Sequence, residues 1–520
     1  MKRLDALCVL GLVPFGLLGQ GLNPADLLKP PATAWPTYNG DYSGRRYSPL
    51  SQINASNVRS LALQWVYRIR DSGGAWTVKA TPLEVNGVLY FTVPNNVWAV
   101  DARSGREIWH FRYPNNPAWI IGNRGVGMYG DWLYFESPDN YLISLNAKNG
   151  KERWRVQIAD VKLEYFSTMA PLVIRNHIIV GVGGDSLDNP GYLESRDPET
   201  GALQWRWNSE PQPGEPGSET WPDKDAMAHG GGMTWMPGTY DPELNLLYWG
   251  TGNPNPVHAG QGRRGDNLWT SSIVALNPDT GKLVWYFQPT PHDTHDWDAT
   301  QTPVLIDGEL SGVKRKLLAQ ANRNGYFFVL DRVDGKHVLT APFVETNWTK
   351  GIDARGVPLA DPSKEPTRDG TLVSPSSGGA TNWFAPSFNP ETGLFYANAS
   401  QNYSVFYLTA KGKAEGFAGR DDGLPGGKGF TIAIEYKTGK ICWRHDGDSN
   451  AGLLSTAGKL LFTGDSSGHL MALDPRTGRA LWHVNTGEYV GNGPITYELG
   501  GHQFVVFASG DTLYAFTLPR

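Results

Sequence analysis

Along most of the chain, a short stretch of alternating apolar and polar residues ends in a polar turn, and a second apolar stretch carrying a tryptophan follows. Two-residue alternation is the pattern of a half-buried β-strand. Asp or Asn followed by x-x-Thr-Gly is turn chemistry, because glycine readily adopts positive φ. The phrase recurs as AVDARSGREIW (99–109), SLNAKNGKERW (144–154), SRDPETGALQW (195–205), ALNPDTGKLVW (275–285), AIEYKTGKICW (433–443) and ALDPRTGRALW (472–482).

Repetition of this unit predicts the fold class. A period of roughly 40–50 residues is typical of propeller blades of four strands each. A degraded copy covers 329–339, and a worn copy, FNPETGLFYANA, covers 388–399. Seven copies and the worn one predict an all-β fold, an eight-bladed β-propeller with repeated DxxTGxxxW motifs. We expect the repeated tryptophans to pack between neighbouring blades and to have no role in function.

The two ends of the chain supply strands without a complete unit. The stretch around Trp65 has a strand and a tryptophan, and 502–519 has strands only. Together they predict one blade closed by both chain ends, which leaves no free sheet edge. With no linker in the sequence, we expect a single propeller domain over 30–520.

The N-terminus, 1–21, has the order of a signal peptide. Two basic residues precede an apolar stretch that ends in small residues, too short for a comfortable membrane span. The alternative is a buried N-terminal segment. No other long apolar run is present, so we expect an exported, periplasmic chain without a membrane span.

Composition narrows the function further. The net charge of -5 and the absence of a Lys/Arg-rich run argue against nucleic acid as a partner. Of the two cysteines, Cys8 would leave with the signal peptide, and we expect Cys442 to be a small buried apolar residue. There is no CxxCH haem motif, so an electron carrier would be another molecule or a non-haem cofactor.

The stretch PHDTHDWDATQTP, 291–303, concentrates acids and bases. In an extended chain Asp296 and Asp298 would point to one side with Trp297 opposite. Two like charges at one spot are costly unless a cation or proton intervenes. The alternative is a polar loop whose aspartates cap turns. A zinc site with His292 and His295 lacks supporting Cys or HExxH patterns.

Three further irregular stretches carry candidate ligands. Asn253 lies in a Gly/Pro-rich turn after an apolar strand, and Asp185 and Asp188 follow a Gly-rich strand end. Trp235 follows Gly230–Gly232, a run that would let the backbone approach a flat group. That tryptophan is either a floor under a planar cofactor or another packing residue. Carboxylates and an amide with few soft ligands favour a hard, oxygen-seeking ion over zinc or copper.

These motifs carry a family resemblance. GTGNP, RGDNL, TPHDTHDWDA and the repeated DxxTGxxxW make the chain similar to the quinoprotein alcohol dehydrogenases, from WPTYNGDYSGRRYSPLSQINASNV (35–58) to LYAFTLP (513–519). The resemblance implies an eight-bladed propeller that binds pyrroloquinoline quinone (PQQ) and one lanthanide(III) or Ca²⁺ ion. It further implies oxidation of a primary alcohol, or an aldehyde, with electrons passed to a soluble cytochrome c.

The resemblance also implies roles for individual residues. Asp296 matches the catalytic base, and Arg323 matches the basic residue near the reactive quinone oxygens. Asn253 matches a metal ligand. Asp298 matches the extra aspartate of lanthanide-using members, which favours a lanthanide over calcium; the alternative is a turn cap. The positions that match residues contacting the cofactor are Arg124, Thr168, Trp235 and Asn382.

Three positions depart from the family pattern. An adjacent cysteine pair above the quinone is replaced by Ala118-Trp119. The metal-binding Glu aligns with Ser186, and we expect Asp185 beside it to take over as ligand. A Glu near the cofactor aligns with Lys79, which reverses a charge close to an anionic cofactor.

Two other functions stay open on the sequence. A non-catalytic propeller scaffold of the outer-membrane assembly type would need the repeats but not the acidic cluster or Arg323. A quinoprotein acting on sugars or polyols would differ only in its pocket. The sequence names neither the alcohol nor the cytochrome, and it leaves open whether the chain forms a homodimer.

Overall fold

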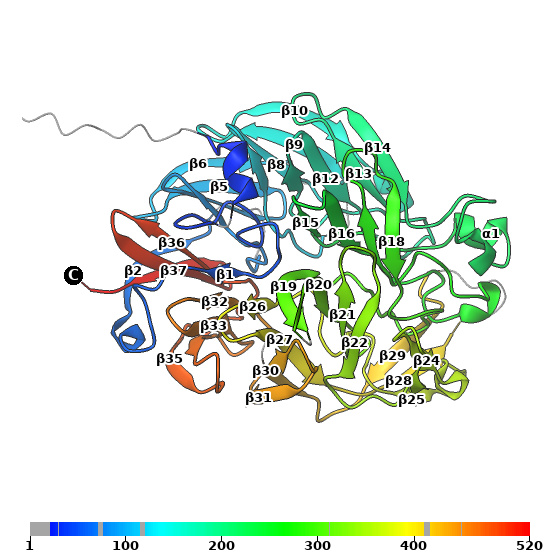
Figure 1. Ribbon diagram of the computed structural model, residues 1–520. Coiled ribbons are helices and arrows are strands. Elements are labelled where there is room, and N and C mark those ends of the chain that lie inside the picture. Colours follow the sequence, from blue (N-terminus) through cyan, green and yellow to red (C-terminus); the bar gives the residue numbers. More distant parts are fainter. Residues whose placement is uncertain are drawn as a thin grey trace, which may run out of the picture.

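The repeated unit folds into antiparallel sheets that follow one another around the molecule (Figure 1). The computed structural model describes residues 21–29, 31–70, 76–114, 120–310, 312–409, 416–448 and 450–519. Within them, eight sheets have four or five strands and two smaller sheets have two and three. The predicted signal peptide lies outside the described residues except for Gly21.

Five of the eight large sheets are each built from four strands that follow one another in the chain. The first four sheets are β3 (Leu83–Val85), β4 (Val88–Val93), β5 (Asn96–Asp101) and β6 (Glu107–Arg112); β7 (Gly127–Tyr129), β8 (Trp132–Glu136), β9 (Tyr141–Asn146) and β10 (Glu152–Gln157); β11 (Leu172–Ile174), β12 (His177–Gly181), β13 (Tyr192–Arg196) and β14 (Leu203–Asn208); and β15 (Thr239–Asp241), β16 (Leu246–Gly250), β17 (Ile273–Leu276) and β18 (Leu283–Phe287).

The other large sheets complete the ring. They are β19 (Val304–Leu310), β20 (Val313–Ala321), β21 (Tyr326–Asp331) and β22 (His337–Pro342); β26 (Ser387–Asn389), β27 (Leu394–Gln401), β30 (Lys428–Glu435) and β31 (Ile441–Asp446); β1 (Tyr47–Ser48), β32 (Leu454–Thr456), β33 (Leu460–Gly464), β34 (His469–Leu473) and β35 (Ala480–Asn485); and β2 (Ala62–Arg68), β36 (Ile495–Leu499), β37 (His502–Ser509) and β38 (Thr512–Thr517).

Insertions between these sheets, and between strands of one sheet, hold the remaining elements. The small sheets are β23 (Thr349–Ile352) with β24 (Pro358–Ala360), and β25 (Thr371–Val373) with β28 (Ser404–Leu408) and β29 (Gly419–Gly423). The helices are α1 (Lys224–Ala228) and the 3-10 turns η1 (Pro24–Leu28), η2 (Val58–Ser60), η3 (Val161–Leu163), η4 (Ser218–Thr220), η5 (Gly260–Gly262) and η6 (Pro362–Lys364). No helix of the described residues is long and apolar enough to span a membrane.

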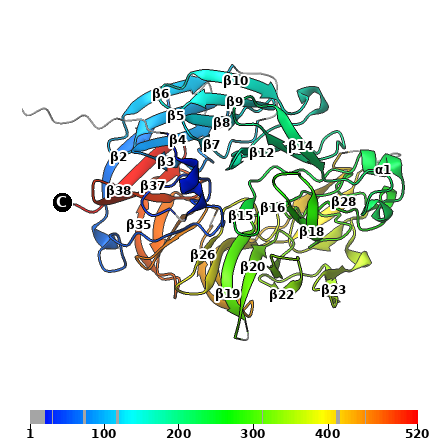
Figure 2. The ribbon, with the colours of Figure 1, turned by 45° about the horizontal axis from the view of Figure 1, so that its top comes forward.

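Both chain ends contribute to the last sheet, as the sequence predicts. Strand β2 pairs antiparallel with β38, and Trp65 lies opposite Ala515. Figure 2 shows the early strand beside the C-terminal strands β37 and β38. Because β2 and β38 lie side by side in one sheet, main-chain hydrogen bonds between the two ends of the chain close the ring.

The repeated tryptophans pack between neighbouring sheets, also as predicted. The indole of Trp205 donates from Nε1 to the carbonyl of Pro278 at 2.7 Å, in the turn of the following sheet. Gly281 of that turn has φ +68°, and a Cβ on it would lie 2.6 Å from Cε3 of Trp205. Trp65, Trp109, Trp285 and Trp443 make the equivalent indole-to-carbonyl bond to the next sheet. Glycine is therefore required at position 281 for two reasons: the backbone has positive φ, and the ring of Trp205 leaves no room for a Cβ.

This interlock predicts a stability effect. Gly281→Ala is expected to lower the free energy of unfolding by about 2 kcal/mol, because a methyl group there meets a fixed ring as well as an unfavourable φ. Gly214→Ala is the matched control, since Gly214 has φ +91° but no heavy atom near its Cβ position. Urea unfolding of both variants separates the two costs; equal losses would contradict a steric role for Trp205.

Two details of the sequence reading are wrong. Cys442 is exposed rather than buried, because it lies on the outer strand β31 next to the inward-facing Trp443. The worn copy at 388–399 is the turn between β26 and β27, the first pair of its sheet, whereas the other copies join a third strand to a fourth. The stretch between the turns at Gly335 and Gly439 therefore contains one large sheet with insertions rather than two. The eighth large sheet is the one that the two chain ends share.

Candidate active site

The candidate residues gather at one end of the sheets. Each lies either just before the first strand of a sheet or between its second and third strands. In an up-and-down sheet these two kinds of connection share one end, and the DxxTG turns lie at the other. The fold therefore separates the structural turns from the loops that carry chemistry.

The loop between β18 and β19 is held in shape by Asp293. Its buried carboxylate accepts the backbone N–H groups of His295 at 3.0 Å and Trp297 at 2.7 Å. His295 stacks on Trp297 with ring centroids 4.4 Å apart, and its Nε2 lies 2.9 Å from the carbonyl of Lys364. Burial lowers the pKa of His295 to about 3, so it is a neutral packing residue.

The two histidines of this loop do not form a zinc site. His292 contacts the carbonyl of Gly265 through Nδ1 at 2.8 Å, away from the partner of His295. Within the described ranges, no three His, Cys, Asp or Glu side chains are close enough together to hold a metal ion in this arrangement. His292, Asp293 and His295 are thus supporting residues of the loop.

Asp296 and Asp298 converge on Arg323, which lies between β20 and β21. The guanidinium contacts Asp296 Oδ2 at 3.2 Å and Asp298 Oδ2 at 2.7 Å. Their convergence does not come from an extended chain, because Asp296 has φ +67°. The extended geometry predicted from the spacing is therefore wrong, and the guanidinium brings the two carboxylates together.

Asp298 links several of the candidate residues through its two carboxylate oxygens. Its Oδ1 accepts the backbone N–H of Asn253 at 2.8 Å, and its Oδ2 accepts Nε1–H of Trp235 at 2.9 Å. With the contact from Arg323, Asp298 accepts three hydrogen bonds. A carboxylate has about four lone-pair directions, so one direction remains free. Asp298 thereby links loops from two neighbouring sheets and retains one direction for a cation.

Asp185 completes the acidic group from the loop between β12 and β13. Its Oδ1 is buried without a hydrogen-bond partner among the described residues. Burial, followed by the charge of Asp298, raises the pKa of Asp185 to about 7. Burial and the neighbouring carboxylates also raise the pKa of Asp296, against the opposing charge of Arg323.

The charges of this group fit a hard cation. Three carboxylates of Asp185, Asp296 and Asp298 interact with one guanidinium, which leaves an excess of two negative charges when all are ionised. A cation among them would restore their ionised forms and satisfy the orphaned oxygen of Asp185. Carboxylate oxygens are the donors that lanthanide and calcium ions prefer, although among the described residues the three carboxylates do not form a preformed metal cage, because Arg323 lies between two of them.

An aromatic site lies beside the acidic group. Cζ of Arg124 is 4.7 Å from the ring centroid of Trp235 and 5.1 Å from that of Trp383. The same guanidinium donates to Oγ1 of Thr168, whose hydroxyl lies 3.5 Å from the carbonyl of Trp235. Arg124, Thr168 and Trp235 are therefore neighbours, although they come from three different sheets.

Trp383 is a site residue that the sequence reading missed. It follows Asn382, whose side chain bonds to its own loop: Nδ2 donates to the carbonyl of Gly378 at 2.9 Å, and Oδ1 accepts the N–H of Trp383 at 2.8 Å. The segment also encloses Arg323, which donates to the carbonyl of Ser377. Trp383 lies outside all of the repeated motifs, and that position is the feature of the sequence that could have identified it.

The glycine run before Trp235 has a different use from the one expected. A Cβ on Gly231 would lie 2.7 Å from the carbonyl of Asn253, and one on Gly232 would lie 2.6 Å from Oγ of Ser209. The groups that lie close to these glycines belong to the protein, whereas the sequence suggested a flat cofactor there. They let the Trp235 loop lie against the Asn253 loop, which holds the two halves of the site together.

The other departures from the family pattern are only partly described. Ala118-Trp119 lies outside the described residues. Ser186 is half-buried, and a Cβ on Gly416 would lie 2.9 Å from its carbonyl oxygen. Lys79 lies at the aromatic site, with Nζ 6.0 Å from the ring centroid of Trp383.

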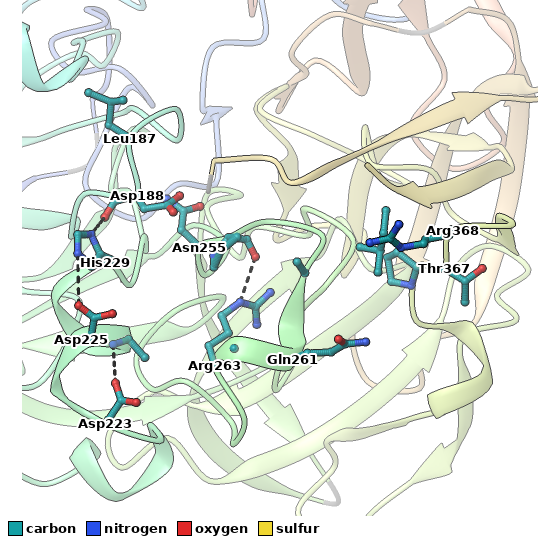
Figure 3. Close-up of a pocket in the computed structure, with 16 residues that line it drawn as sticks. Leu187, Asp188, Asp223, Asp225, His229, Asn255, Gln261, Arg263, Thr367 and Arg368 are labelled. Carbon is teal, nitrogen blue, oxygen red and sulfur yellow. Dashed lines mark hydrogen bonds and ion pairs between the residues drawn. The ribbon is translucent and has the colours of Figure 1, made fainter. Parts of the chain in front are cut away.

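A separate pocket has a volume of about 760 Å³ (Figure 3). Asp188, Asp223, Asp225 and His229 lie along one wall, and Arg368 and Thr367 lie across from them. None of the catalytic, cofactor or metal residues predicted from the sequence lines it. Two of its lining residues, Asp188 and Asn255, are close in the chain to Asp185 and Asn253.

Fold and site together place an acidic group beside two tryptophans at one end of a ring of antiparallel sheets. The family model of the PQQ glucose/ethanol/alcohol dehydrogenase β-propeller domain matches residues 35–351 and 428–505. The chain belongs to this family of PQQ-dependent dehydrogenases, oxidoreductases that act on CH–OH groups.

Individual relatives agree with this assignment. The chain is 37% identical to the quinohemoprotein alcohol dehydrogenase ADH IIB of Pseudomonas putida, over 96% of this chain and 76% of that protein. It is 35% identical to a 1-butanol dehydrogenase (cytochrome c) of Thauera butanivorans, over 92% of this chain and 74% of that protein. A solved europium-containing methanol dehydrogenase superposes with a TM-score of 0.86 at 28% identity, covering 95% of this chain and 99% of that one.

Proposed function

We propose that the chain is a periplasmic dehydrogenase that oxidises a primary alcohol with PQQ and a lanthanide(III) or Ca²⁺ ion, and passes the electrons to a soluble cytochrome c. The observation that carries the proposal is the bridge from Arg323 to Asp296 and Asp298, next to the orphaned carboxylate of Asp185. A bound PQQ would supply a quinone acceptor for the hydride equivalent of the alcohol carbon, and a bound ion would supply Lewis-acid polarisation.

Asp296 is proposed as the general base. Its side chain is 21% exposed, whereas that of Asp298 is 5% exposed, so Asp296 is the carboxylate of the pair that reaches open space. Asp296 accepts the hydroxyl proton of the alcohol. Its raised pKa requires positive charge nearby to keep it ionised, and Arg323 together with the ion supplies that charge.

The remaining residues bind and orient. Asp185, Asn253, Asp296 and Asp298 are proposed to hold the ion. Trp235 offers one aromatic face to the cofactor, and Arg124, Thr168 and Asn382 are placed to hold its polar edge. Arg323 keeps the base in position and stabilises negative charge that develops on the quinone oxygens.

Support for the acceptor and compartment comes from outside the site. The relative from Thauera butanivorans is named a 1-butanol dehydrogenase (cytochrome c), and this sequence has no CxxCH haem motif. The N-terminal pattern of charged, apolar and small residues favours export.

Reconstitution tests the proposal directly. Purified chain with PQQ and either La³⁺ or Ca²⁺ should reduce an artificial electron-accepting dye in the presence of ethanol or 1-butanol, and it should not do so without PQQ. Glucose in place of the alcohol tests the sugar alternative. No turnover with either ion would contradict the proposal and favour a scaffold; preference for glucose would assign the sugar class.

A further inference from the structure

Two cationic side chains face the same tryptophan at the aromatic site. Nζ of Lys79 lies 6.0 Å and Cζ of Arg124 lies 5.1 Å from the ring centroid of Trp383. Among the described residues, no carboxylate pairs with either one. Burial and then repulsion from Arg124 lower the pKa of Lys79, and burial lowers the pKa of Arg124 to about 10.

Both cations are held in place by the protein. Nζ of Lys79 donates to the carbonyl of Ile121 at 2.7 Å, and its chain runs over Gly122, where a Cβ would lie 2.8 Å from Cδ of the lysine. Arg124 is 4% exposed and anchored on Thr168, yet its buried Nε has no hydrogen-bond partner among the described residues. The pair is therefore a fixed, incompletely satisfied site for an anion.

We propose that Lys79 and Arg124 together bind one carboxylate group of PQQ at the edge of Trp383. Lys79 is then a cofactor-positioning residue, at a position for which the family resemblance implies a glutamate. The inference rests on the proposed function, because it takes the cofactor to be PQQ.

The chemistry of the two cations supports a carboxylate. Two like charges in a partly buried site are unfavourable until an anion lies between them. Arginine offers a planar fork that suits a carboxylate, and lysine adds a point charge. A glutamate at 79 would instead neutralise Arg124, so the substitution changes the local charge from near zero to about +2.

An anionic substrate is the other source of a carboxylate, and a binding experiment separates the two. The full chain saturated with Ca²⁺ is titrated with PQQ, and binding is followed by quenching of tryptophan fluorescence. Lys79→Met is expected to raise the Kd about tenfold at low salt, the loss of one charge-assisted contact. The wild-type Kd should also rise more steeply with NaCl than that of the variant.

Two controls make the result decisive. Lys282→Met applies the same change at an exposed turn and should leave the Kd unchanged; Lys79→Arg keeps the charge and should restore most of the affinity. Thermal melting checks that Lys79→Met folds. A Kd within twofold of wild type, with the same salt dependence, would overturn the inference while leaving PQQ binding intact.

The remaining outcomes are equally distinct. If the KM for a hydroxycarboxylate rises in Lys79→Met while the KM for the matched alcohol and the Kd for PQQ stay constant, the anion belongs to the substrate and the cofactor assignment is overturned. If the wild-type chain binds no PQQ, the proposed function fails, and the inference fails with it.

Discussion

Asp296→Asn should lower kcat for alcohol oxidation by roughly a thousandfold, the scale of a lost general base. Asparagine is nearly the same size and can still accept the contact from Arg323, but it cannot take the hydroxyl proton. Because Asp296 is the more exposed member of the carboxylate pair, folding should be little affected. Dye-linked turnover with saturating PQQ and ion measures the effect.

The control for this variant is Asp369→Asn, which makes the same change at an exposed carboxylate outside the candidate site. It should have wild-type kcat. PQQ binding by Asp296→Asn, measured by fluorescence, should persist, since the cofactor residues are untouched. A variant that retains more than a tenth of wild-type kcat would remove Asp296 from the role of base.

Asp298→Ala should abolish the advantage of a lanthanide over calcium. A trivalent ion gains more from one extra carboxylate than a divalent one, so the apparent affinity for La³⁺ should fall roughly a hundredfold, and that for Ca²⁺ much less. The substitution also releases Trp235, the Asn253 loop and Arg323. Breaking this buried pair should cost about 3 kcal/mol of the free energy of unfolding.

The ratio of La³⁺ to Ca²⁺ affinity is the informative measurement, because the structural damage is common to both ions. It is obtained by titrating each ion into metal-free chain with PQQ present. Asp369→Ala serves as the matched control. An unchanged ratio in Asp298→Ala would make the aspartate a support for Trp235 and Arg323 rather than a ligand.

The sequence alone predicts only part of the acidic site. Asp293 supports its loop through backbone groups two and four residues away, whereas His292 and His295 contact Gly265 and Lys364, which lie far away in the sequence. Asp296 and Asp298 were identified as a pair, but with the wrong geometry. Spacing rules assume regular φ and ψ, and the positive φ of Asp296 departs from them.

Residues that act through distant partners were harder to find. Trp383 went unnoticed because its importance lies in its proximity to Arg124, which is far away in sequence. Cys442 was misplaced because its own strand is the outer one of its sheet, and one-sequence patterning does not tell an outer strand from an inner one. The worn repeat at 388–399 has real turn chemistry but joins a different pair of strands.

By itself, the sequence determined the repeated strand–turn–strand unit, the tryptophan contact between neighbouring sheets and the sheet shared by the chain ends. These follow from hydrophobic alternation and turn residues, which act over a few positions and recur. Only the tertiary structure decided that Arg323 joins Asp296 to Asp298, that Asp298 holds Trp235 and the Asn253 loop, and that Lys79 and Arg124 share one ring. Those contacts depend on loops from different sheets meeting at one end of the ring, and their distances are set by the packing of the sheets rather than by any local pattern.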